Sequence, residues 1–571
     1  MSSPYKDRFW RKNWDEGLTD LDPSSFEISY TKAVKDTFER VPEKMALAYQ
    51  GLEITYDELD KYSNQFANML VKQGFKKGDV VGINLPNIPE YVIAFLGTLK
   101  AGCVVSGVSP LMSDVQMHYQ LNDLGAGEKN VALVTLDAIF QHRLKNIESK
   151  LPQLKLVVWT SVIGIFPKEQ QNKIRAVREI PSGEVTPLEG KTVLDFHDDV
   201  LAQYSTDSPN ITVTPDDIAL IQYTGGTTGP PKGAMLTHRN CVSDLLIVQK
   251  WLSWESGAKI ALSGFPFFHI AGTFFCENCI YLGWGQVLIP DPRDSLHICN
   301  EIKKYKPTAL VNVPSLYQIL INTRKFKRLD HSNLDFCISA ASPFPEESQR
   351  QLESIVGEGK LLEVYGMTET SPLTTMNPMK GKRILGSIGL PLLNTELKIA
   401  DPDTGEEVPV GEPGEICVKG PMVMKGYYNK PEETKKAIDQ DGYMHTGDVA
   451  YMDETGYLRI VDRTKDMIIV GGYKLFSTKV EDILSKHPAV GMIALIGLVN
   501  PDRPGSEIAK AFIQINPEYE FDGNEDALKE DIIKFARENC APYEVPKVIE
   551  FSKELPLTVV GKIDKKLLRE A

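Results

Sequence analysis

A loop rich in glycine and threonine constrains the fold of this chain more than any other stretch. Residues 223–233 read YTGGTTGPPKG. The run 217–221 before them is typical of a short buried strand, and apolar residues recur at helical spacing from Asn240 onward. Glycines let backbone N–H groups turn toward an anion, while threonine hydroxyls and Lys232 add donors and positive charge. The stretch therefore indicates a polyphosphate-binding loop, with a flexible surface loop as the structural alternative.

The Walker phosphate loop does not fit these residues. That motif, G-x-x-x-x-G-K-[ST], places a hydroxyl residue directly after its lysine. Here Pro231 precedes Lys232 and Gly233 follows it. The loop therefore favours a phosphate site and argues against the commonest phosphate-binding fold.

Bulk properties exclude several classes of function. The net charge of −14 argues against a nucleic-acid-binding surface. The N-terminus lacks the apolar segment of a signal peptide, and no run of about 18 apolar residues predicts a membrane span. Eight scattered cysteines fit a reducing cytoplasm. The one CxxC pair, Cys276 and Cys279, is predicted to be buried thiols on a helix, with zinc or redox chemistry as the alternative.

At 571 residues the chain is expected to divide into domains. Strand-like and helix-like patterns alternate from residue 29 to 370, which is typical of α/β units, whereas 160–215 is predicted to be an elaborated surface region. Residues 1–30 are expected to wrap the surface, and β-rich segments follow residue 386. The expected boundary lies in 461–466, which gives domains 1–464 and 465–571. The expected elements are helices at 29–41, 56–73, 88–102, 480–484 and 528–538, a hairpin at 46–49 and 52–56, and strands at 80–84, 396–400, 414–420, 492–499 and 510–515.

The loop resembles the phosphate loop of the acyl-adenylate-forming superfamily, which includes acyl-CoA synthetases, luciferases and peptide-synthetase adenylation domains. The pattern of that family is close to T-S-G-T-T-G-x-P-K-G, with Gly225 here where serine is usual. Further blocks similar to the family follow in order from Pro266 to Lys562, so the resemblance covers nearly the whole chain. It implies a large N-terminal adenylation domain, in which sheets are layered with helices beside a small β-barrel-like subdomain. It also implies a small mobile α+β C-terminal domain, with the site between the two.

The resemblance assigns ATP and Mg²⁺ to this site. Tyr365 would supply an aromatic face for adenine, Asp448 would accept hydrogen bonds from the ribose hydroxyls, and Thr368 and Glu369 would supply hard oxygen ligands for Mg²⁺. The structural alternatives are a strand-to-helix turn capped by Thr368 and an Asx-turn at Asp448. The chain has Glu363-Val364 where many relatives have Gln-Gly. The other nucleotide-binding residues that the resemblance implies are Thr224, Gly225, Gly226, Thr227, Thr228, Gly229, Lys232, Ala341, Ser342, Gly366 and Arg463.

Catalysis is assigned by resemblance to three residues. His269 would line the carboxylate site, and Lys465 would be the hinge residue about which the domains rotate. Lys562 would be the catalytic lysine. Gly472 and Lys474 would line the tunnel for coenzyme A. The structural alternatives are a core histidine, a solvated linker and a surface lysine.

The function implied is an ATP-dependent acyl-CoA ligase that acts in two steps through an acyl adenylate. Residues 273–275 (TFF) after His269 are predominantly apolar and favour an acid without a cationic amine, and the opening of the chain is similar to fatty acyl-CoA ligases. A medium- or long-chain fatty acid is the predicted substrate, with a hydroxycinnamate-type aryl acid as the alternative. A stand-alone enzyme that loads a carrier protein and an ATP-binding relative without activity are the other readings. A homodimer and peripheral membrane contact stay open.

Overall fold

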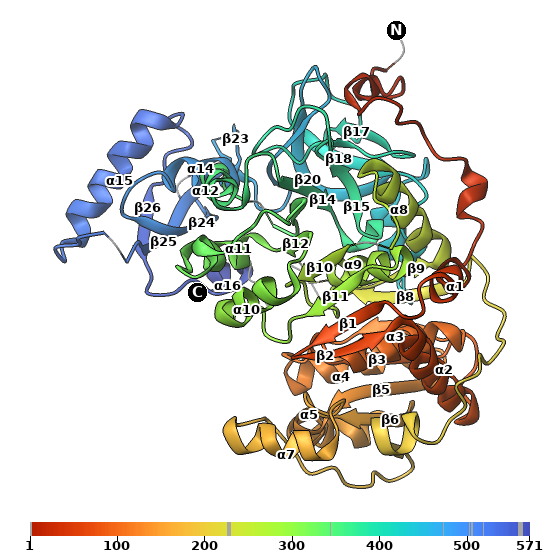
Figure 1. The fold of residues 1–571 in the computed structure, drawn as a ribbon. Helices are drawn as coiled ribbons and strands as arrows, with labels where there is room; N and C mark the ends of the chain where they lie inside the picture. Colours follow the sequence, from red (N-terminus) through yellow and green to blue (C-terminus); the bar gives the residue numbers. More distant parts are fainter. Residues whose placement is uncertain are drawn as a thin grey trace.

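The computed structural model describes residues 3–224, 230–257, 259–342, 344–471, 473–501, 503, 506–517, 519–557 and 563–570. Two wide sheets and a four-stranded sheet form a large N-terminal part, and a smaller C-terminal part, drawn in blue in Figure 1, lies to one side. The predicted fold class, mixed α/β with a large domain followed by a small one, is confirmed.

The first wide sheet has eight described strands. In spatial order they are β19 (Gly426–Tyr427), β9 (Gly233–Thr237), β8 (Ile218–Tyr223), β4 (Val104–Gly107), β3 (Val80–Asn84), β5 (Val131–Leu136), β6 (Leu154–Thr160) and β7 (Thr192–Asp195). The strands from β8 to β7 are parallel, and β9 and β19 continue the sheet in antiparallel pairs. Val81 and Ile83 of β3 join one hydrophobic core and Val80 joins another, so both faces of the sheet are covered.

The second wide sheet has nine described strands and carries much of the candidate site. In spatial order they are β16 (Leu390–Pro391), β15 (Leu373–Met376), β14 (Leu361–Gly366), β13 (Phe336–Ser339), β12 (Ala309–Asn312), β10 (Ile260–Ser263), β11 (Gly285–Leu288), β1 (Met45–Tyr49) and β2 (Leu52–Thr55). The strands from β14 to β1 are parallel, and antiparallel strands close both ends. The carboxyl ends of the parallel strands therefore share one edge, where ligands bind in sheets of this kind.

Helices pack between the two wide sheets and on their outer faces. Those whose buried side chains join the central core are α1 (Tyr30–Arg40), α2 (Tyr56–Lys72), α3 (Pro89–Lys100), α8 (His238–Trp251) and α9 (Ile270–Leu282). The outer helices include α4 (Asp114–Leu124), α5 (Asp137–Ile139) and α6 (Lys145–Ile147) on the first sheet and α10 (Ser295–Tyr305), α11 (Pro314–Asn322) and α12 (Glu346–Val356) on the second. Cys276 and Cys279 are buried free thiols on α9, as predicted.

Most local predictions for the first 110 residues are confirmed. The expected helices are α1, α2 and α3, and the expected hairpin is β1 and β2. Helix α2 begins at a capping box in which Thr55 accepts from the backbone of Glu58 and Glu58 accepts from the backbone of Thr55. The N-terminal segment does more than wrap the surface, because Trp10 is fully buried in the central core.

The prediction for residues 160–215 is wrong in part. This region contains the edge strand β7, which pairs with β6, and the exposed helix α7 (Lys168–Val177). Strand β7 has only four residues, none of them fully buried, so it lacks the alternation that marks a half-buried strand. Strand β7 forms because it pairs with β6, and a local sequence pattern does not predict this pairing.

A four-stranded antiparallel sheet follows the wide sheets. Its strands are β17 (Glu396–Ala400), β18 (Gly414–Lys419), β20 (Met444–Met452) and β21 (Leu458–Arg463), and α13 (Pro431–Ala437) lies between β19 and β20 in the chain. Leu397, Ile399, Ile416 and Val418 alternate inward and join the central core. The sheet is therefore packed onto the rest of the large part.

The C-terminal part has a separate core. Its elements are β22 (Ile468–Val470), β23 (Tyr473–Leu475), α14 (Ser477–Leu484), β24 (Val490–Val499), β25 (Glu507–Ile515), α15 (Glu525–Asn539), β26 (Val548–Phe551) and α16 (Lys565–Glu570). The main cluster of buried side chains here runs from Ile468 to Ile549 and is separate from the central core. The helices and strands expected after residue 480 are confirmed within α14, α15, β24 and β25.

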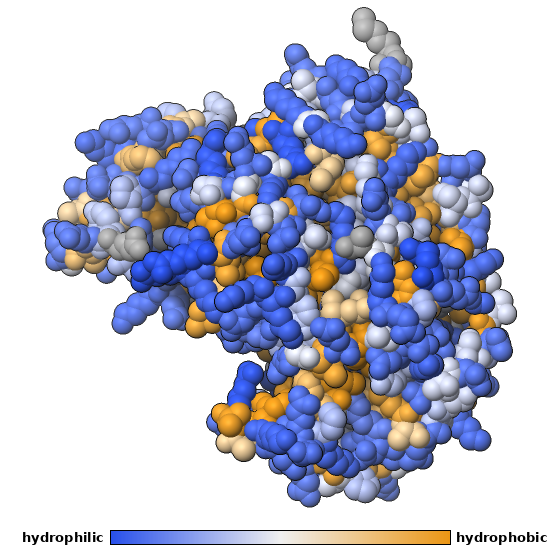
Figure 2. Space-filling view, viewed as in Figure 1, coloured by the Kyte–Doolittle hydropathy of each residue, from blue (hydrophilic) through white to orange (hydrophobic). Residues whose placement is uncertain are grey.

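Figure 2 shows this face of the molecule covered mostly by hydrophilic side chains, with small hydrophobic areas scattered among them. Among the described helices, none combines the length and the apolar character that crossing a membrane would require.

Candidate active site

The strands that flank the threonine-rich loop, β8 and β9, form an antiparallel pair. Tyr223 at the end of β8 pairs with Gly233 at the start of β9, and the backbone N–H of Thr224 donates to the carbonyl of Lys232 over 3.0 Å. Strand β9 follows the loop, and the helix expected from Asn240 onward is α8, which begins at His238. Strand β9 forms because Ala234 and Leu236 alternate into the core. The predicted phosphate-binding residues Gly225, Gly226, Thr227, Thr228 and Gly229 lie outside the described residues.

Lys232 points at an aromatic ring that the sequence analysis missed. Its Nζ lies 4.4 Å from the centre of the Tyr427 ring and 3.3 Å from Glu433 Oε2. The Tyr427 hydroxyl donates to Glu369 Oε1 over 2.6 Å. Tyr427 lies on β19, which pairs with β9, so sheet pairing brings it beside the loop. No local motif marks Tyr427, because its neighbours come from distant parts of the chain.

Glu369 has a buried carboxylate, and its Oε1 accepts the hydrogen bond from the Tyr427 hydroxyl. It lies in the short 3-10 helix η7 (Thr368–Thr370), in which Thr368 is also buried. Burial raises the pKa of Glu369, while the Tyr427 hydroxyl and the charge of Lys232 act in the opposite direction. A fixed carboxylate beside a threonine supplies the hard oxygen atoms that Mg²⁺ prefers, so these residues fit the predicted metal.

Tyr365, Asp448 and Arg463 meet in one cluster from three strands. The Tyr365 hydroxyl donates to Asp448 Oδ2 over 2.8 Å, and Arg463 Nε lies 2.9 Å from Asp448 Oδ1. Asp448 on β20 is directly opposite Arg463 on β21 in the antiparallel register. Three residues predicted to bind one nucleotide are therefore in contact, and each Asp448 oxygen keeps further lone-pair capacity for a diol.

Two small residues predicted to bind the nucleotide, Ala341 and Gly366, lie at the carboxyl ends of β13 and β14. Ala341 follows β13 with φ +74°, a left-handed conformation that a residue with a Cβ seldom adopts. Gly366 ends β14, and a Cβ there would lie 1.7 Å from the carbonyl oxygen of Pro372, so only glycine fits. Ala341 therefore has a strained backbone and Gly366 a closely approached one, and such strain is concentrated at functional sites. Ser342 follows Ala341 and is partly exposed.

Glu363 is buried in β14. Its Oε2 accepts a hydrogen bond of 2.7 Å from Gln349 of α12. Burial raises the pKa of Glu363 to about 7, against the effect of Gln349. This carboxyl group is bound to α12, and no hydrogen bond between it and the residues of the Tyr365 cluster is seen in the described part of the chain.

His269 caps α9 beside an apolar cavity. Its Nδ1 accepts from the backbone N–H of Ala271 over 3.3 Å. The cavity has a volume of about 30 Å³. Every side chain that lines it is apolar: Val248, Trp254, Phe265, Ala271, Phe274, Phe275, Val311, Ile338, Ala340, Val364, Pro372, Leu373 and Met376. Ala340 and Val364 directly precede Ala341 and Tyr365 in the chain, so this cavity adjoins the nucleotide-binding candidates.

A larger cavity of about 270 Å³ lies elsewhere, at the turn between β1 and β2. Its lining is mainly polar and carries both signs of charge: Gln50, Arg178, Pro290, Asp291, Asp294, His297 and Glu301. None of these is a predicted site residue. The smaller cavity therefore suits an apolar group, whereas the larger one suits a polar or charged group.

The residues that join the two parts form a tight turn after β21. The backbone N–H groups of Asp466 and Met467 both donate to the carbonyl of Arg463. Burial, and next the charge of Arg463, lower the pKa of Lys465 to about 8. Asp462 is buried and accepts a 3.0 Å hydrogen bond from the Ser477 hydroxyl, which ties β21 to the first residue of α14.

The predicted residues of the C-terminal part are only partly described. Lys474 lies on β23, and its Nζ is 3.7 Å from both Asp401 Oδ2 and Asp403 Oδ2, in the segment after β17. Gly472 and Lys562 lie outside the described residues. The structure therefore brings together Lys232, Glu369, Tyr365, Asp448 and Arg463, whereas Lys474 faces acidic residues of the four-stranded part.

Comparison with known proteins identifies the family of the chain. Residues 34–428 match the family described as AMP-binding enzyme, and residues 479–562 match the AMP-binding enzyme C-terminal domain. The chain belongs to the AMP-binding enzyme family. A protein named long-chain-fatty-acid–CoA ligase from Bacillus subtilis is 37% identical over 551 residues, which cover 94% of this chain and 93% of the relative. A protein of the same name from Escherichia coli is 34% identical over 97% of this chain and 96% of its own length.

Solved structures resemble this AMP-binding enzyme along nearly its whole length. The anthranilate CoA ligase AuaEII in complex with anthranoyl-AMP superimposes with a TM-score of 0.82 at 26% identity, over 96% of this chain and 98% of that one. ATP-bound MatB from Rhodopseudomonas palustris gives a TM-score of 0.79 at 26% identity, over 95% and 99% of the two chains. The family predicted from the loop and the blocks that follow it is therefore confirmed.

Proposed function

We propose that this AMP-binding enzyme is an ATP-dependent acyl-CoA ligase, which joins a carboxylic acid to coenzyme A through an acyl adenylate. The proposal depends on one observation: the apolar cavity lies next to the residues predicted to bind the nucleotide. Ala340 and Val364 line an apolar cavity, and the next residues, Ala341 and Tyr365, belong to the nucleotide-binding candidates. An acid whose tail lies in the cavity would present its carboxylate toward the nucleotide.

A medium- or long-chain fatty acid is the proposed substrate. The wholly apolar lining supports it, as do the names of the relatives, and none of the side chains that line the cavity could pair with a cationic amine. The cavity volume of about 30 Å³ holds about one or two waters. Binding of a fatty acid therefore requires large side chains of the lining, such as Phe274, Phe275 or Trp254, to change position.

In the first step the substrate carboxylate attacks the α-phosphorus of ATP, and pyrophosphate leaves. Negative charge develops on the phosphate oxygens, so the protein contributes mainly positioned cations and donors. Lys232 and Lys562 are the proposed cations, and Thr224 with the adjoining glycines and threonines supplies hydroxyl and backbone donors. Glu369 and Thr368 would hold Mg²⁺, which neutralises phosphate charge when bound.

In the second step the coenzyme A thiol attacks the acyl carbonyl, and AMP leaves. We place the domain boundary between Thr464 and Lys465, with Lys465 as the hinge. This is supported by the separate core of residues 468–549 and by β21, which ends the four-stranded sheet. Rotation about Lys465 would break the ion pairs of Lys474 with Asp401 and Asp403, which frees Lys474 and Gly472 to line the path of the thiol.

A reducing location is also proposed. All eight cysteines are free, and seven of them are buried. Free thiols in a chain of this length support the cytoplasm as its compartment.

The test uses the full chain with ATP, Mg²⁺ and free coenzyme A and a panel of acids from octanoate to palmitate, with a hydroxycinnamate for comparison. Pyrophosphate release reports the first step, and thioester formation reports the second. We expect both signals with fatty acids. Pyrophosphate release without a thioester would favour the carrier-loading alternative, and signals with the aryl acid alone would remove the fatty-acid assignment.

A further inference from the structure

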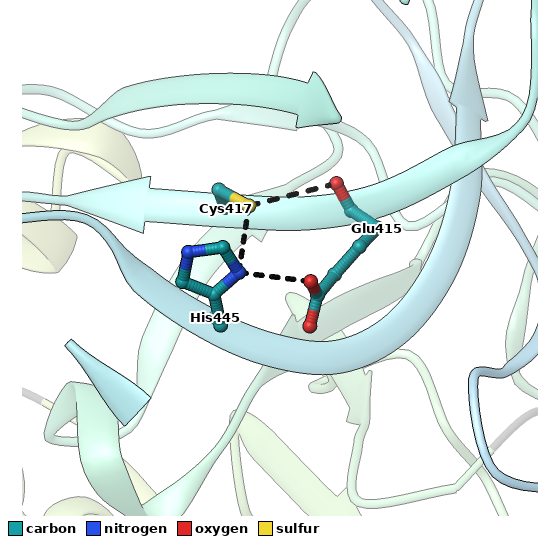
Figure 3. A group of neighbouring side chains, drawn as sticks. All are labelled: Glu415, Cys417 and His445. Atoms are coloured by element: carbon teal, nitrogen blue, oxygen red, sulfur yellow. Dashed lines mark hydrogen bonds and ion pairs between the residues drawn. The ribbon is translucent and has the colours of Figure 1, made fainter. Parts of the chain in front are cut away.

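Three side chains with metal-binding atoms lie together between β18 and β20 of the four-stranded sheet (Figure 3). Glu415 and Cys417 are on β18, and Cys417 is directly opposite His445 of β20. The register is irregular between Glu415 and Cys417, which lets both side chains reach the same imidazole. One ligand atom from each residue lies within 4.8 Å of the other two.

The distances suit a small cation at the centre of the group. Cys417 Sγ lies 3.6 Å from His445 Nδ1, and Glu415 Oε2 lies 2.9 Å from the same nitrogen. In a tetrahedral zinc site, bond lengths of about 2.0–2.3 Å place neighbouring ligand atoms about 3.4–3.6 Å apart. The sulfur and nitrogen already have this separation, and the Glu415 carboxylate would move outward by about 0.5 Å.

The second nitrogen of His445 and the second carboxylate oxygen of Glu415 have partners of their own in the structure. His445 Nε2 lies 3.6 Å from Asp439 Oδ2, and Glu415 Oε1 accepts from the backbone N–H of Gly447 over 2.8 Å. In this structure Nδ1–H of His445 donates to Glu415 Oε2. When that proton leaves and a proton on Nε2 is directed to Asp439, the Nδ1 lone pair becomes available to an ion between Cys417 and Glu415. A carboxylate behind a ligating histidine is the usual way in which a protein orients that ligand.

Burial and donor chemistry favour zinc over magnesium. Cys417 is fully buried and Glu415 is 7% exposed, whereas the His445 side chain is 27% exposed and faces the route by which an ion would arrive. A thiolate and an imidazole are ligands for Zn²⁺, whereas Mg²⁺ prefers oxygen atoms alone. A divalent cation also balances the two negative charges of a thiolate and a carboxylate.

We propose that Cys417 Sγ, His445 Nδ1 and Glu415 Oε2 bind one Zn²⁺, with water as the fourth ligand. On binding, the Cys417 thiol loses its proton to solvent as the sulfur–metal bond forms, and any proton on His445 Nδ1 leaves in the same way. The site would fix the segment of β20 that carries Asp448, three residues after His445. It is distinct from the Mg²⁺ site proposed at Glu369.

The experiment is a Co²⁺ titration of the full chain, after treatment with a chelator and a reductant, in excess Mg²⁺. Tetrahedral cobalt bound to a thiolate gives a near-ultraviolet sulfur-to-metal charge-transfer band with visible d–d bands. We expect these bands to saturate at one Co²⁺ per chain and to be abolished by Zn²⁺. The Cys417→Ser variant should lose the charge-transfer band, whereas Cys540→Ser, at the partly exposed free cysteine after α15, should keep it.

Two further measurements separate binding from folding. Asp439→Asn leaves all three ligands in place and should weaken zinc binding about 10- to 100-fold, the range seen when a carboxylate behind a ligand is lost. Zn²⁺ should raise the melting temperature of the wild type and not that of Cys417→Ser. Absence of the charge-transfer band in the wild type, or its persistence in Cys417→Ser, would overturn the proposal and leave the three residues as a hydrogen-bonded group only.

Discussion

The Tyr427 hydroxyl offers the sharpest test of the proposed Mg²⁺ site. Tyr427→Phe removes the 2.6 Å hydrogen bond to Glu369 Oε1 and keeps the ring, whose centre lies 4.4 Å from Lys232 Nζ. Glu369 is only 6% exposed, so water cannot fully replace the lost donor. The substitution therefore isolates one hydrogen bond to one carboxylate.

The magnitude follows from the strength of a hydrogen bond to a charged group, ~1.5–3 kcal/mol. Since about 1.4 kcal/mol corresponds to a factor of ten, the ratio of ionised to protonated Glu369 should fall about 10- to 100-fold. Burial already raises the pKa of Glu369, and loss of the Tyr427 hydroxyl raises it further. If catalysis needs the ionised carboxylate, activity is present above this pKa and is lost as the pH falls through it. The acidic limb of the profile should therefore move to higher pH in the variant.

The assay is the pH dependence of kcat/KM for ATP in the adenylation step, followed by pyrophosphate release at fixed Mg²⁺. Tyr428→Phe is the matched control, because its hydroxyl donates to the carbonyls of Leu124 and Ala126 and does not contact Glu369. An acidic limb at the same pH in Tyr427→Phe and the wild type would refute the reasoning. So would an equal displacement in Tyr428→Phe, since the effect would then not arise at Glu369.

Three other outcomes are expected. Burial, and next the charge of Asp244, raise the pKa of Glu277 to about 8, so the folded chain keeps a proton that the unfolded chain releases near pH 4.5. The free energy of unfolding should therefore fall as the pH rises between these two values, by up to about 1.4 kcal/mol per pH unit. Glu277→Gln should flatten this decline in urea unfolding curves, and an unchanged slope would contradict the assignment. Ala340→Phe should fill the apolar cavity, at a cost of about 1–3 kcal/mol in the free energy of unfolding. It should lower kcat/KM for palmitate while the KM for ATP stays within about twofold, and undiminished palmitate turnover would place the acyl chain elsewhere. Lys562→Ala should cost ~3–5 kcal/mol in adenylation and still convert supplied acyl-AMP to acyl-CoA, and equal loss of both half-reactions would contradict the alternation of the two domains.

Much of the site could be predicted because its motifs are short and local. The threonine-rich loop, Tyr365 with Glu369, and Asp448 each lie in a stretch whose residue types suit a nucleotide, and their order along the chain resembles one family. The sequence pattern does not predict strand β9. A strand of five residues behind a proline-rich turn has a weak local signal, and it forms because β8 and β19 pair with it on either side.

The amino-acid sequence by itself determined the α/β alternation, the family and the residue types proposed to bind the nucleotide, since these depend on periodicity and on patterns within about ten residues. Only the tertiary structure decided which distant side chains touch. Tyr427 of β19 meets Glu369 of the short helix η7 because β19 pairs with β9 beside it, and Cys417 meets His445 because antiparallel pairing of β18 and β20 places the two residues opposite each other. A register of this kind is set by the packing of both faces of a sheet, so it is a property of the assembled core and not of either strand alone.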